Sequence, residues 1–105
     1  MMADGRADVS RMLAVYEPLL RAFVSGELSA DNFEAAYLAK FKQDRSQVPG
    51  PEFEVLDGLF ADVDDYVADA VLRERAGGLD AEQLRDRARA AYTRLYESRP
   101  GPGRV

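Results

Sequence analysis

Residues 51–69 read PEFEVLDGLFADVDDYVAD and carry the signals of an amphipathic helix. Gly50 can occupy the N-cap, and Pro51 suits the first helical position because no N–H is needed there. Acidic residues follow in the first turn, where the helix dipole favours carboxylates. Apolar side chains then recur every three or four positions and predict one buried stripe with Leu59 beside it: Phe53, Leu56, Phe60, Val63 and Val67. We expect a helix over about residues 51–68.

The opposite side of this predicted helix carries carboxylates with no basic residue nearby in the chain. Between residues 46 and 72 the chain has seven acidic residues and no Lys or Arg. At about 100° per residue, six of them fall together opposite the apolar stripe: Glu54, Asp57, Asp62, Asp64, Asp65 and Asp69. Like charges three or four residues apart cost about a few tenths of a kcal/mol per pair. A basic partner would supply the missing charge, whereas an ordinary solvated face is the alternative, and the pattern alone favours neither.

Composition limits the classes of protein to consider. A chain of 105 residues with 47% hydrophobic residues is long enough for one folded domain, residues 1–105. Cysteine is absent, which excludes disulfides and thiolate chemistry, and the absence of histidine removes the commonest general base. The start lacks a secretory pattern, and no window has the roughly 20 apolar residues of a membrane span. We expect a cytoplasmic protein that does not bind a membrane.

Three further helices are predicted from local signals. Gly26 ends the first helix, Ser29 is a suitable N-cap for the second, and Asp80 with Gln83 has the spacing of a capping box. Gly77-Gly78 breaks the chain before that last helix, after a short helical turn through Val71 and Leu72. The expected bounds are about 8–25, 30–44 and 81–97, with flexible ends at 1–7 and 98–105.

The four predicted helices and their short connections indicate an all-α, antiparallel four-helix bundle. In no segment do apolar and polar residues alternate with the period of two that is typical of a strand. Pro18 cannot donate a backbone hydrogen bond, so we expect a kink or a late helix start near Glu17. The aromatic residues at helical spacing are expected in the core: Phe23, Phe33, Tyr37, Phe41, Phe53 and Phe60. In the last helix the apolar face is Leu84, Ala88, Ala91, Tyr92 and Leu95, and Arg85, Arg87, Arg89 and Arg94 are expected mostly to point outward.

No residue pattern indicates catalysis or metal binding. Asp62, Asp64 and Asp65 are close in sequence, but no nucleophile, phosphate-binding glycine loop or histidine accompanies them. Asp62-Val63-Asp64 resembles the start of a calcium loop, yet positions six and twelve are Val67 and Arg73 rather than Gly and Glu. We therefore expect no catalytic residue, no metal and no cofactor.

Two features of the surface leave alternatives open. Tyr66 lies between the apolar and acidic sides, where it is either a core tyrosine with a hydroxyl in water or an anchor for a partner. The arginines of the last helix alternate with Glu82 and Asp86, which favours a solvated face over a nucleic-acid surface. The acidic middle of the chain would repel phosphate, so nucleic acid is not expected as its ligand.

Three segments together resemble a known family. They are ELSADNFEAAYLAKFKQD at 27–44, PGPEFEVLDGLFADVDDY at 49–66 and LDAEQLRDRARAAY at 79–92. The chain resembles the bacterial self-protective colicin-like immunity family, the group that includes the immunity protein against colicin D. The segment from Leu56 to Tyr66, with the pattern LDxLFxDVDxY, is the most specific part of the resemblance.

The resemblance implies a four-helix bacteriocin immunity protein that is not an enzyme. It would bind a basic toxin nuclease domain, of the tRNase type, and cover the RNA-binding active site with acidic residues. The acids in the matching segment are Asp57, Asp62, Asp64 and Asp65, to which we add Glu54, Tyr66 and Asp69 as expected contacts. We expect the free protein to be a monomer. The rival hypotheses are a helical adaptor unrelated to toxins, for which the acids only confer solubility, and self-association through the same helix.

Overall fold

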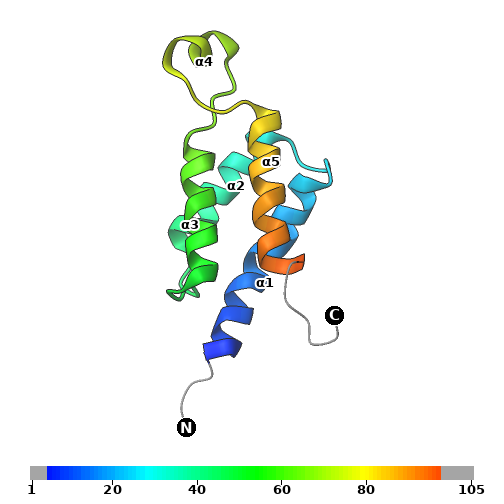
Figure 1. The fold of residues 1–105 in the computed structure, drawn as a ribbon, viewed down its shortest axis with the longest axis vertical. Helices are drawn as coiled ribbons and strands as arrows, with labels where there is room; N and C mark the ends of the chain where they lie inside the picture. The colour runs from blue at the N-terminus through cyan, green and yellow to red at the C-terminus, as the bar shows by residue number, and fades with distance from the viewer. Residues whose placement is uncertain (1–4, 98–105) are drawn as a thin grey trace.

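Four helices pack around a common core and a fifth, short helix lies outside it (Figure 1). The structure is a computed structural model that describes residues 5–97. The helices are α1 (Gly5–Val24), α2 (Ala30–Gln43), α3 (Pro51–Asp64), α4 (Ala70–Ala76) and α5 (Ala81–Tyr92), followed by a π-helical turn (Thr93–Glu97). The all-α class is confirmed, and no strand occurs among these residues. The expected four helices are corrected to five, because the short turn predicted at Val71 and Leu72 is the separate helix α4.

The packing order places α3 between α2 and α5. α1 packs against α5 and α2, and α3 packs against α2 and α5. None of the residues of α4 is buried. Along residues 5–97, none of the helices combines the length and apolar character that a membrane crossing requires.

α1 continues through Pro18 without a break. The helix begins at Gly5 rather than near Asp8, so the expected late start near Glu17 is wrong, and residues 5–7 are helical. Pro18 has no N–H to donate, but four buried side chains before and after it hold both halves of the helix on the core: Met12, Tyr16, Leu20 and Phe23. This tertiary packing outweighs the local preference. A kink at Pro18 stays a prediction, and the expected flexible ends at 1–4 and 98–105 lie outside the described residues.

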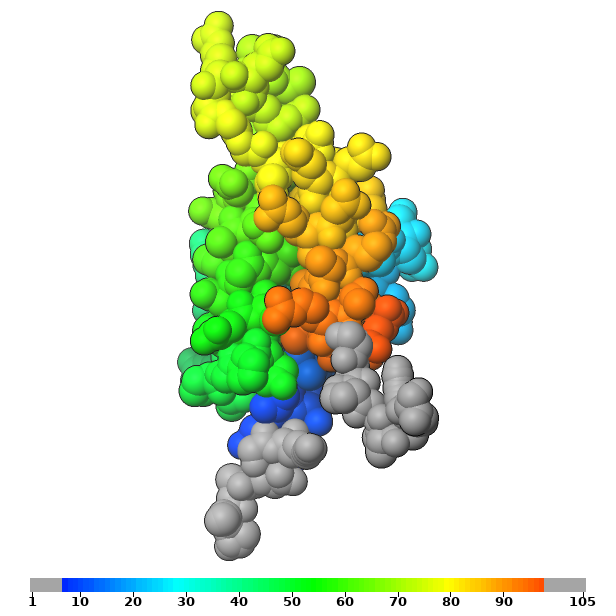
Figure 2. All heavy atoms as spheres, viewed as in Figure 1, coloured from blue at the N-terminus to red at the C-terminus, as the bar shows by residue number. Residues whose placement is uncertain are grey.

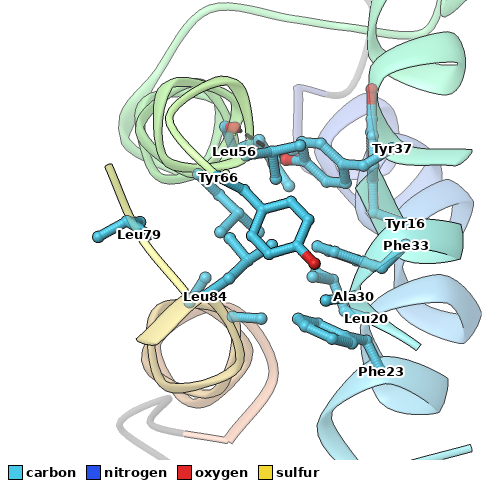
Figure 3. Packing of buried hydrophobic residues seen from close by; sticks show 14 of the residues in the cluster. Tyr16, Leu20, Phe23, Ala30, Phe33, Tyr37, Leu56, Tyr66, Leu79 and Leu84 are labelled. Atoms are coloured by element: carbon cyan, nitrogen blue, oxygen red, sulfur yellow. Dashed lines mark hydrogen bonds between the residues drawn. The ribbon is translucent and has the colours of Figure 1, made fainter. Parts of the chain in front are cut away.

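The core is rich in aromatic rings, as the helical spacing predicts (Figure 3). Phe23 of α1 stacks on Phe33 of α2 with ring centroids 4.1 Å apart. Phe41 stacks on Phe60 of α3 at 4.6 Å, which joins α2 to α3 near the other end of α2. The hydroxyl of the fully buried Tyr37 donates to the carbonyl of Leu56 at 2.8 Å, so its polar group is satisfied inside the core. Phe41 and Phe60 are partly buried, and the other core side chains include Leu56, Val63, Leu84 and Ala88.

Local capping chemistry fixes the starts of three helices. Ser29 caps α2 by accepting a 3.2 Å hydrogen bond from the backbone N–H of Asn32. Gly50, with φ +146°, is the N-cap of α3 and Pro51 is its first helical residue. Asp80 and Gln83 form both hydrogen bonds of a capping box at the start of α5. All three predicted starts are confirmed.

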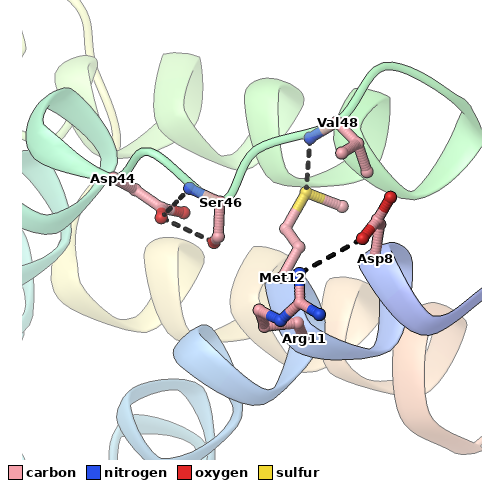
Figure 4. A network of polar contacts seen from close by, with 6 residues as sticks. All are labelled: Asp8, Arg11, Met12, Asp44, Ser46 and Val48. Atoms are coloured by element: carbon pink, nitrogen blue, oxygen red, sulfur yellow. Dashed lines mark hydrogen bonds and ion pairs between the residues drawn. The ribbon is translucent and has the colours of Figure 1, made fainter. Parts of the chain in front are cut away.

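The loop between α2 and α3 is tied to α1 by polar contacts (Figure 4). Asp44 accepts hydrogen bonds from the backbone N–H and the hydroxyl of Ser46, at 2.8 and 2.6 Å, and from the Tyr16 hydroxyl at 2.7 Å. Burial disfavours the charged carboxylate, but these hydrogen bonds outweigh it and lower the pKa of Asp44. The N–H of Val48 donates to Sδ of Met12 at 3.4 Å. The loop that leads into α3 is therefore held against α1 at two points.

α3 ends at Asp64, earlier than the predicted residue 68, because the next residues pair with a distant segment. The N–H of Val67 donates to the carbonyl of Leu79 at 2.9 Å, and the N–H of Leu79 donates to the carbonyl of Asp65 at 2.9 Å. These bonds form an isolated parallel bridge between Tyr66 and Leu79. Residues 68–78, which we call the α4 loop, leave the bundle at this bridge and return to it. In Figure 2 the α4 loop projects beyond the neighbouring ends of α3 and α5.

Candidate partner-binding surface

Four of the predicted contact residues are exposed carboxylates that stay unpaired. Glu54, Asp57, Asp64 and Asp65 all lie on the outer side of α3 or directly after it. Within residues 5–97, no hydrogen bond or ion pair involves the side chain of any of these four acids. The prediction that the outer side of α3 carries carboxylates without basic partners therefore holds for these four residues.

Asp57 and Asp64 lie on the side of α3 toward α2, where two further acids lie. They are seven positions apart, so they occupy one face of α3 about 10 Å apart along its axis. Burial raises the pKa of Tyr37 on α2, and the charge of Asp57 is among the causes that raise it further. Burial also raises the pKa of Glu34, and the charges of Asp31 and Asp64 raise it further. The charge of Asp64 on α3 therefore acts on Glu34 of α2 across the two helices. We call Asp31, Glu34, Asp57 and Asp64 the acidic surface.

Sequence reasoning missed Asp31 and Glu34 as members of this surface. A signal was present, because the two acids are three residues apart on one helix and no Lys or Arg occurs between Arg21 and Lys40. The pairing of α2 with α3 places this second unneutralised pair beside the first. The surface is therefore shared by two helices rather than confined to α3.

Tyr66 lies beneath the acidic surface and holds one of its members. Its side chain is 8% exposed, and its hydroxyl donates a 2.7 Å hydrogen bond to Oδ1 of Asp31. Burial, followed by the hydrogen bond to Asp31 and the charge of Asp31, raises the pKa of Tyr66 to about 12. The hydroxyl is thus protonated at neutral pH and fixes the orientation of the Asp31 carboxylate. Tyr66 is therefore a core residue, but its hydroxyl bonds Asp31 rather than water, and its role as an anchor for a partner stays a prediction.

Asp62 faces the other neighbour of α3 and is neutralised there. Arg87 of α5 donates to Oδ1 of Asp62 at 3.0 Å, and the Asp62 side chain is 27% exposed. Burial raises the pKa of Asp62, the charge of Arg87 acts in the opposite direction, and Asp65 raises the pKa further. The expectation of an unneutralised carboxylate at Asp62 is corrected, because helix packing brings a basic residue 25 positions away in sequence onto it.

An open groove of about 350 Å³ runs between α3 and α5 beside this ion pair. Small residues widen it: a Cβ at Gly58 would meet nothing within 4 Å, and Ala90 and Ala91 line the α5 side. Acidic and basic side chains both line the groove. Its local charge is therefore mixed, in contrast to the uniformly acidic α2 side of α3.

Asp69 has a structural task at the start of α4. Its carboxylate accepts hydrogen bonds from the backbone N–H groups of Val71 and Leu72, at 2.8 and 3.2 Å. Because α3 ends at Asp64, Asp69 does not continue the acidic side of that helix. The predicted helical alignment of Asp69 with Asp62 and Asp65 is therefore wrong.

One arginine of α5 has a role that its spacing did not indicate. Arg85 donates from Nε to the carbonyl of Phe23 at 3.0 Å and from Nη2 to the carbonyl of Leu28 at 3.2 Å. Its guanidinium lies 4.6 Å from the centre of the Phe23 ring. It therefore adds a second donor to the Phe23 carbonyl, which also accepts from the N–H of Gly26 at 3.1 Å, and covers the core rather than pointing outward as predicted.

The described residues hold no cluster of three or more acidic side chains arranged to bind a metal ion. In the calcium-like segment the Asp62 side chain is bonded to Arg87 of α5, whereas the charge of Asp64 acts on Glu34 of α2 and, after burial, helps to raise its pKa. The absence of a catalytic site and of a cofactor stays a prediction.

Comparison with known proteins decides the family. The model of a family described as bacterial self-protective colicin-like immunity matches residues 12–95, which include most of α1 and all of α2 to α5. The chain belongs to this family. The resemblance seen in its sequence is therefore confirmed, and membership implies a toxin as the binding partner. Immunity proteins are generally not enzymes. No curated protein and no solved structure matches the chain.

Proposed function

We propose that this immunity protein neutralises the basic nuclease domain of a toxin, of the colicin D type that cleaves tRNA, by covering its RNA-binding active site. Family membership supports a toxin partner. The observation that carries the rest is the acidic surface, whose four carboxylates have no basic side chain bonded to them within residues 5–97. A nuclease site that binds RNA phosphates is cationic, so fixed carboxylates can occupy it in place of the phosphates.

The contact would centre on the α2 side of α3. Asp57 and Asp64 lie there with Asp31 and Glu34, and Asp65 and Glu54 extend the charge across the outer side of α3. Asp62 and Asp69 act mainly inside the chain, the first with Arg87 and the second at the start of α4. Tyr66 contributes by holding Asp31 rather than by offering its own ring.

Rigidity makes this arrangement suited to inhibition. The stacking of Phe41 on Phe60 and the hydrogen bond from Tyr66 to Asp31 fix α2 and α3 relative to each other. Binding then costs little conformational entropy of the inhibitor backbone, because the helices that carry the carboxylates are already in place. Complementary charge also raises association rates, to about 10⁸–10⁹ M⁻¹s⁻¹ at low salt. Fast capture matters for a protein that must reach a lethal enzyme before it cleaves RNA. In this proposal the protein acts in the cytoplasm as a monomer and performs no catalysis.

The test uses the catalytic domain of the toxin encoded beside the gene of this chain. The domain is titrated with the full chain, tRNA cleavage is followed on gels, and binding is measured by calorimetry. We expect cleavage to stop at one equivalent of the chain, and affinity to fall as salt is raised because exposed charges are screened beyond about 10 Å at 0.1 M. Full cleavage in the presence of excess chain would contradict the proposal.

A further inference from the structure

The α4 loop exposes two large apolar side chains at consecutive positions of α4. Val71 is 60% exposed and Leu72 is 55% exposed, and they are the exposed large hydrophobic residues of the described chain. The other large apolar side chains of residues 7–97 are buried or partly buried. Because exposed apolar area is unfavourable in water, two such neighbours on a projecting helix indicate a contact site.

The loop that carries them is held in a defined shape. Asp69 caps α4, and Nη1 of Arg73 donates to the carbonyls of Val67 and Ala68 at 2.7 and 3.1 Å. Gly78, with φ +113°, closes the loop at a point where a Cβ would lie 2.7 Å from Cγ2 of Val67. The two ends are joined by the bridge between Tyr66 and Leu79. Val71 and Leu72 are thus presented on a preorganised support, which lowers the entropic cost of binding.

The position of the loop connects it to the acidic surface. It begins three residues after Asp65, close to the end of α3 where Tyr66 bonds Asp31 on α2. In Figures 1 and 2 it extends past the bundle at this end. Protein interfaces commonly combine a few apolar anchors with surrounding polar or charged contacts. The α4 loop would supply anchors at one end of the charged area.

We propose that Val71 and Leu72 insert into an apolar recess at the edge of the basic active site of the same toxin domain. The acidic surface would attract the toxin domain, and the two apolar side chains would then anchor the complex. This inference rests on the proposed function. A second copy of the chain is the competing occupant, but its net charge of −5 and its own acidic surface would repel the carboxylates next to the loop. A basic partner is attracted by the same carboxylates, which is why we assign the loop to the toxin.

The test measures the affinity of Val71→Ala plus Leu72→Ala for the toxin domain, with Glu74→Ala plus Arg75→Ala as the matched control. Both variants alter exposed residues of α4, and both keep the net charge. Alanine favours helix, and α4 buries no residue, so both should fold. We expect the apolar variant to bind more weakly by about tenfold or more, as for anchor residues, and the control to bind like the native chain. Val71→Thr plus Leu72→Gln, which keeps the size of the side chains, should show the same loss.

The outcomes separate this inference from the proposed function. Native affinity in both apolar variants would overturn the anchor while leaving inhibition by the acidic surface intact. An equal loss in the control would also overturn it, because the apolar side chains would then have no special role. Sedimentation gives a further outcome. If the native chain is a dimer and the Val71→Ala plus Leu72→Ala variant is a monomer, the loop would be assigned to a second copy instead. If the native chain does not bind the toxin domain, the proposed function fails and the anchor fails with it.

Discussion

The Tyr66 hydroxyl donates a 2.7 Å hydrogen bond to Oδ1 of Asp31. This bond joins a residue two positions after the end of α3 to the first turn of α2. One interaction thus serves both the fold and the acidic surface. It closes the packing of the two helices, and it fixes a carboxylate that belongs to the proposed toxin contact.

Tyr66→Phe should lower the free energy of unfolding by about 1 kcal/mol, because a hydrogen bond to a charged but exposed carboxylate is lost while the ring stays in the core. It should also weaken toxin binding, since Asp31 is no longer held. Urea unfolding and calorimetry measure the two effects. Tyr92→Phe is the matched control: its hydroxyl also donates at 2.7 Å to a carboxylate, Glu17, on the α1–α5 side. Equal losses of toxin affinity in both variants would contradict the role assigned to Tyr66.

Glu34→Gln should raise stability at neutral pH, and the gain should disappear in acid. Burial and the charges of Asp31 and Asp64 raise the pKa of Glu34 in the folded state. The folded chain therefore binds this proton more tightly than the unfolded chain does. The contribution of Glu34 to stability is fully present below its unfolded pKa and is lost as the pH rises through its folded pKa.

The expected gain at pH 7 is about a few tenths of a kcal/mol, the size of one like-charge pair three residues apart. Thermal unfolding between pH 7 and pH 3 measures it. Glu74→Gln on α4 controls for the loss of a carboxylate outside the bundle. A Glu34→Gln variant that is less stable than the native chain at pH 7 would show that Glu34 is not repelled by its neighbours.

Arg85→Ala should destabilise the protein by about 2 kcal/mol. It removes two part-buried hydrogen bonds to backbone carbonyls together with the contact between the guanidinium and the Phe23 ring. Arg85→Lys should recover only part of this, since an ammonium cannot reproduce the planar fork of donors. Arg89→Ala is the control, because its bond to Asp86 is an exposed ion pair worth about 0–1 kcal/mol. If Arg85→Ala and Arg89→Ala unfold at the same urea concentration, Arg85 does not hold α1 and α5 together.

The parts of the fold that the sequence predicts well are those decided by neighbouring residues. Ser29, Gly50 and the Asp80–Gln83 pair act within one helical turn, so their roles follow from local chemistry. The aromatic core follows from spacing alone, because residues such as Phe33 and Tyr37 share one side of α2.

The parts that the sequence misses depend on contacts between distant segments. The end of α3 is set by hydrogen bonds to Leu79, and the neutralisation of Asp62 is set by Arg87 on another helix. The capping of α1 by Arg85 joins residues 62 positions apart. The membership of Asp31 and Glu34 in the acidic surface likewise requires knowing that α2 lies beside α3. Helical periodicity describes one helix at a time and contains none of these relationships.

The affinity of Asp57→Asn plus Asp64→Asn for the toxin domain tests directly whether the acidic surface binds it. Glu82→Gln plus Asp86→Asn is the control, because it removes the same charge from exposed positions on α5. Neither Asp57 nor Asp64 bonds another side chain within residues 5–97, so Tm should stay within about 2 °C of the native value. We predict that the Asp57/Asp64 variant binds about a hundredfold more weakly, with a smaller dependence on salt, while the control keeps native affinity. Native affinity in the Asp57/Asp64 variant, or the same loss in both variants, would contradict the assignment of the toxin contact to this surface.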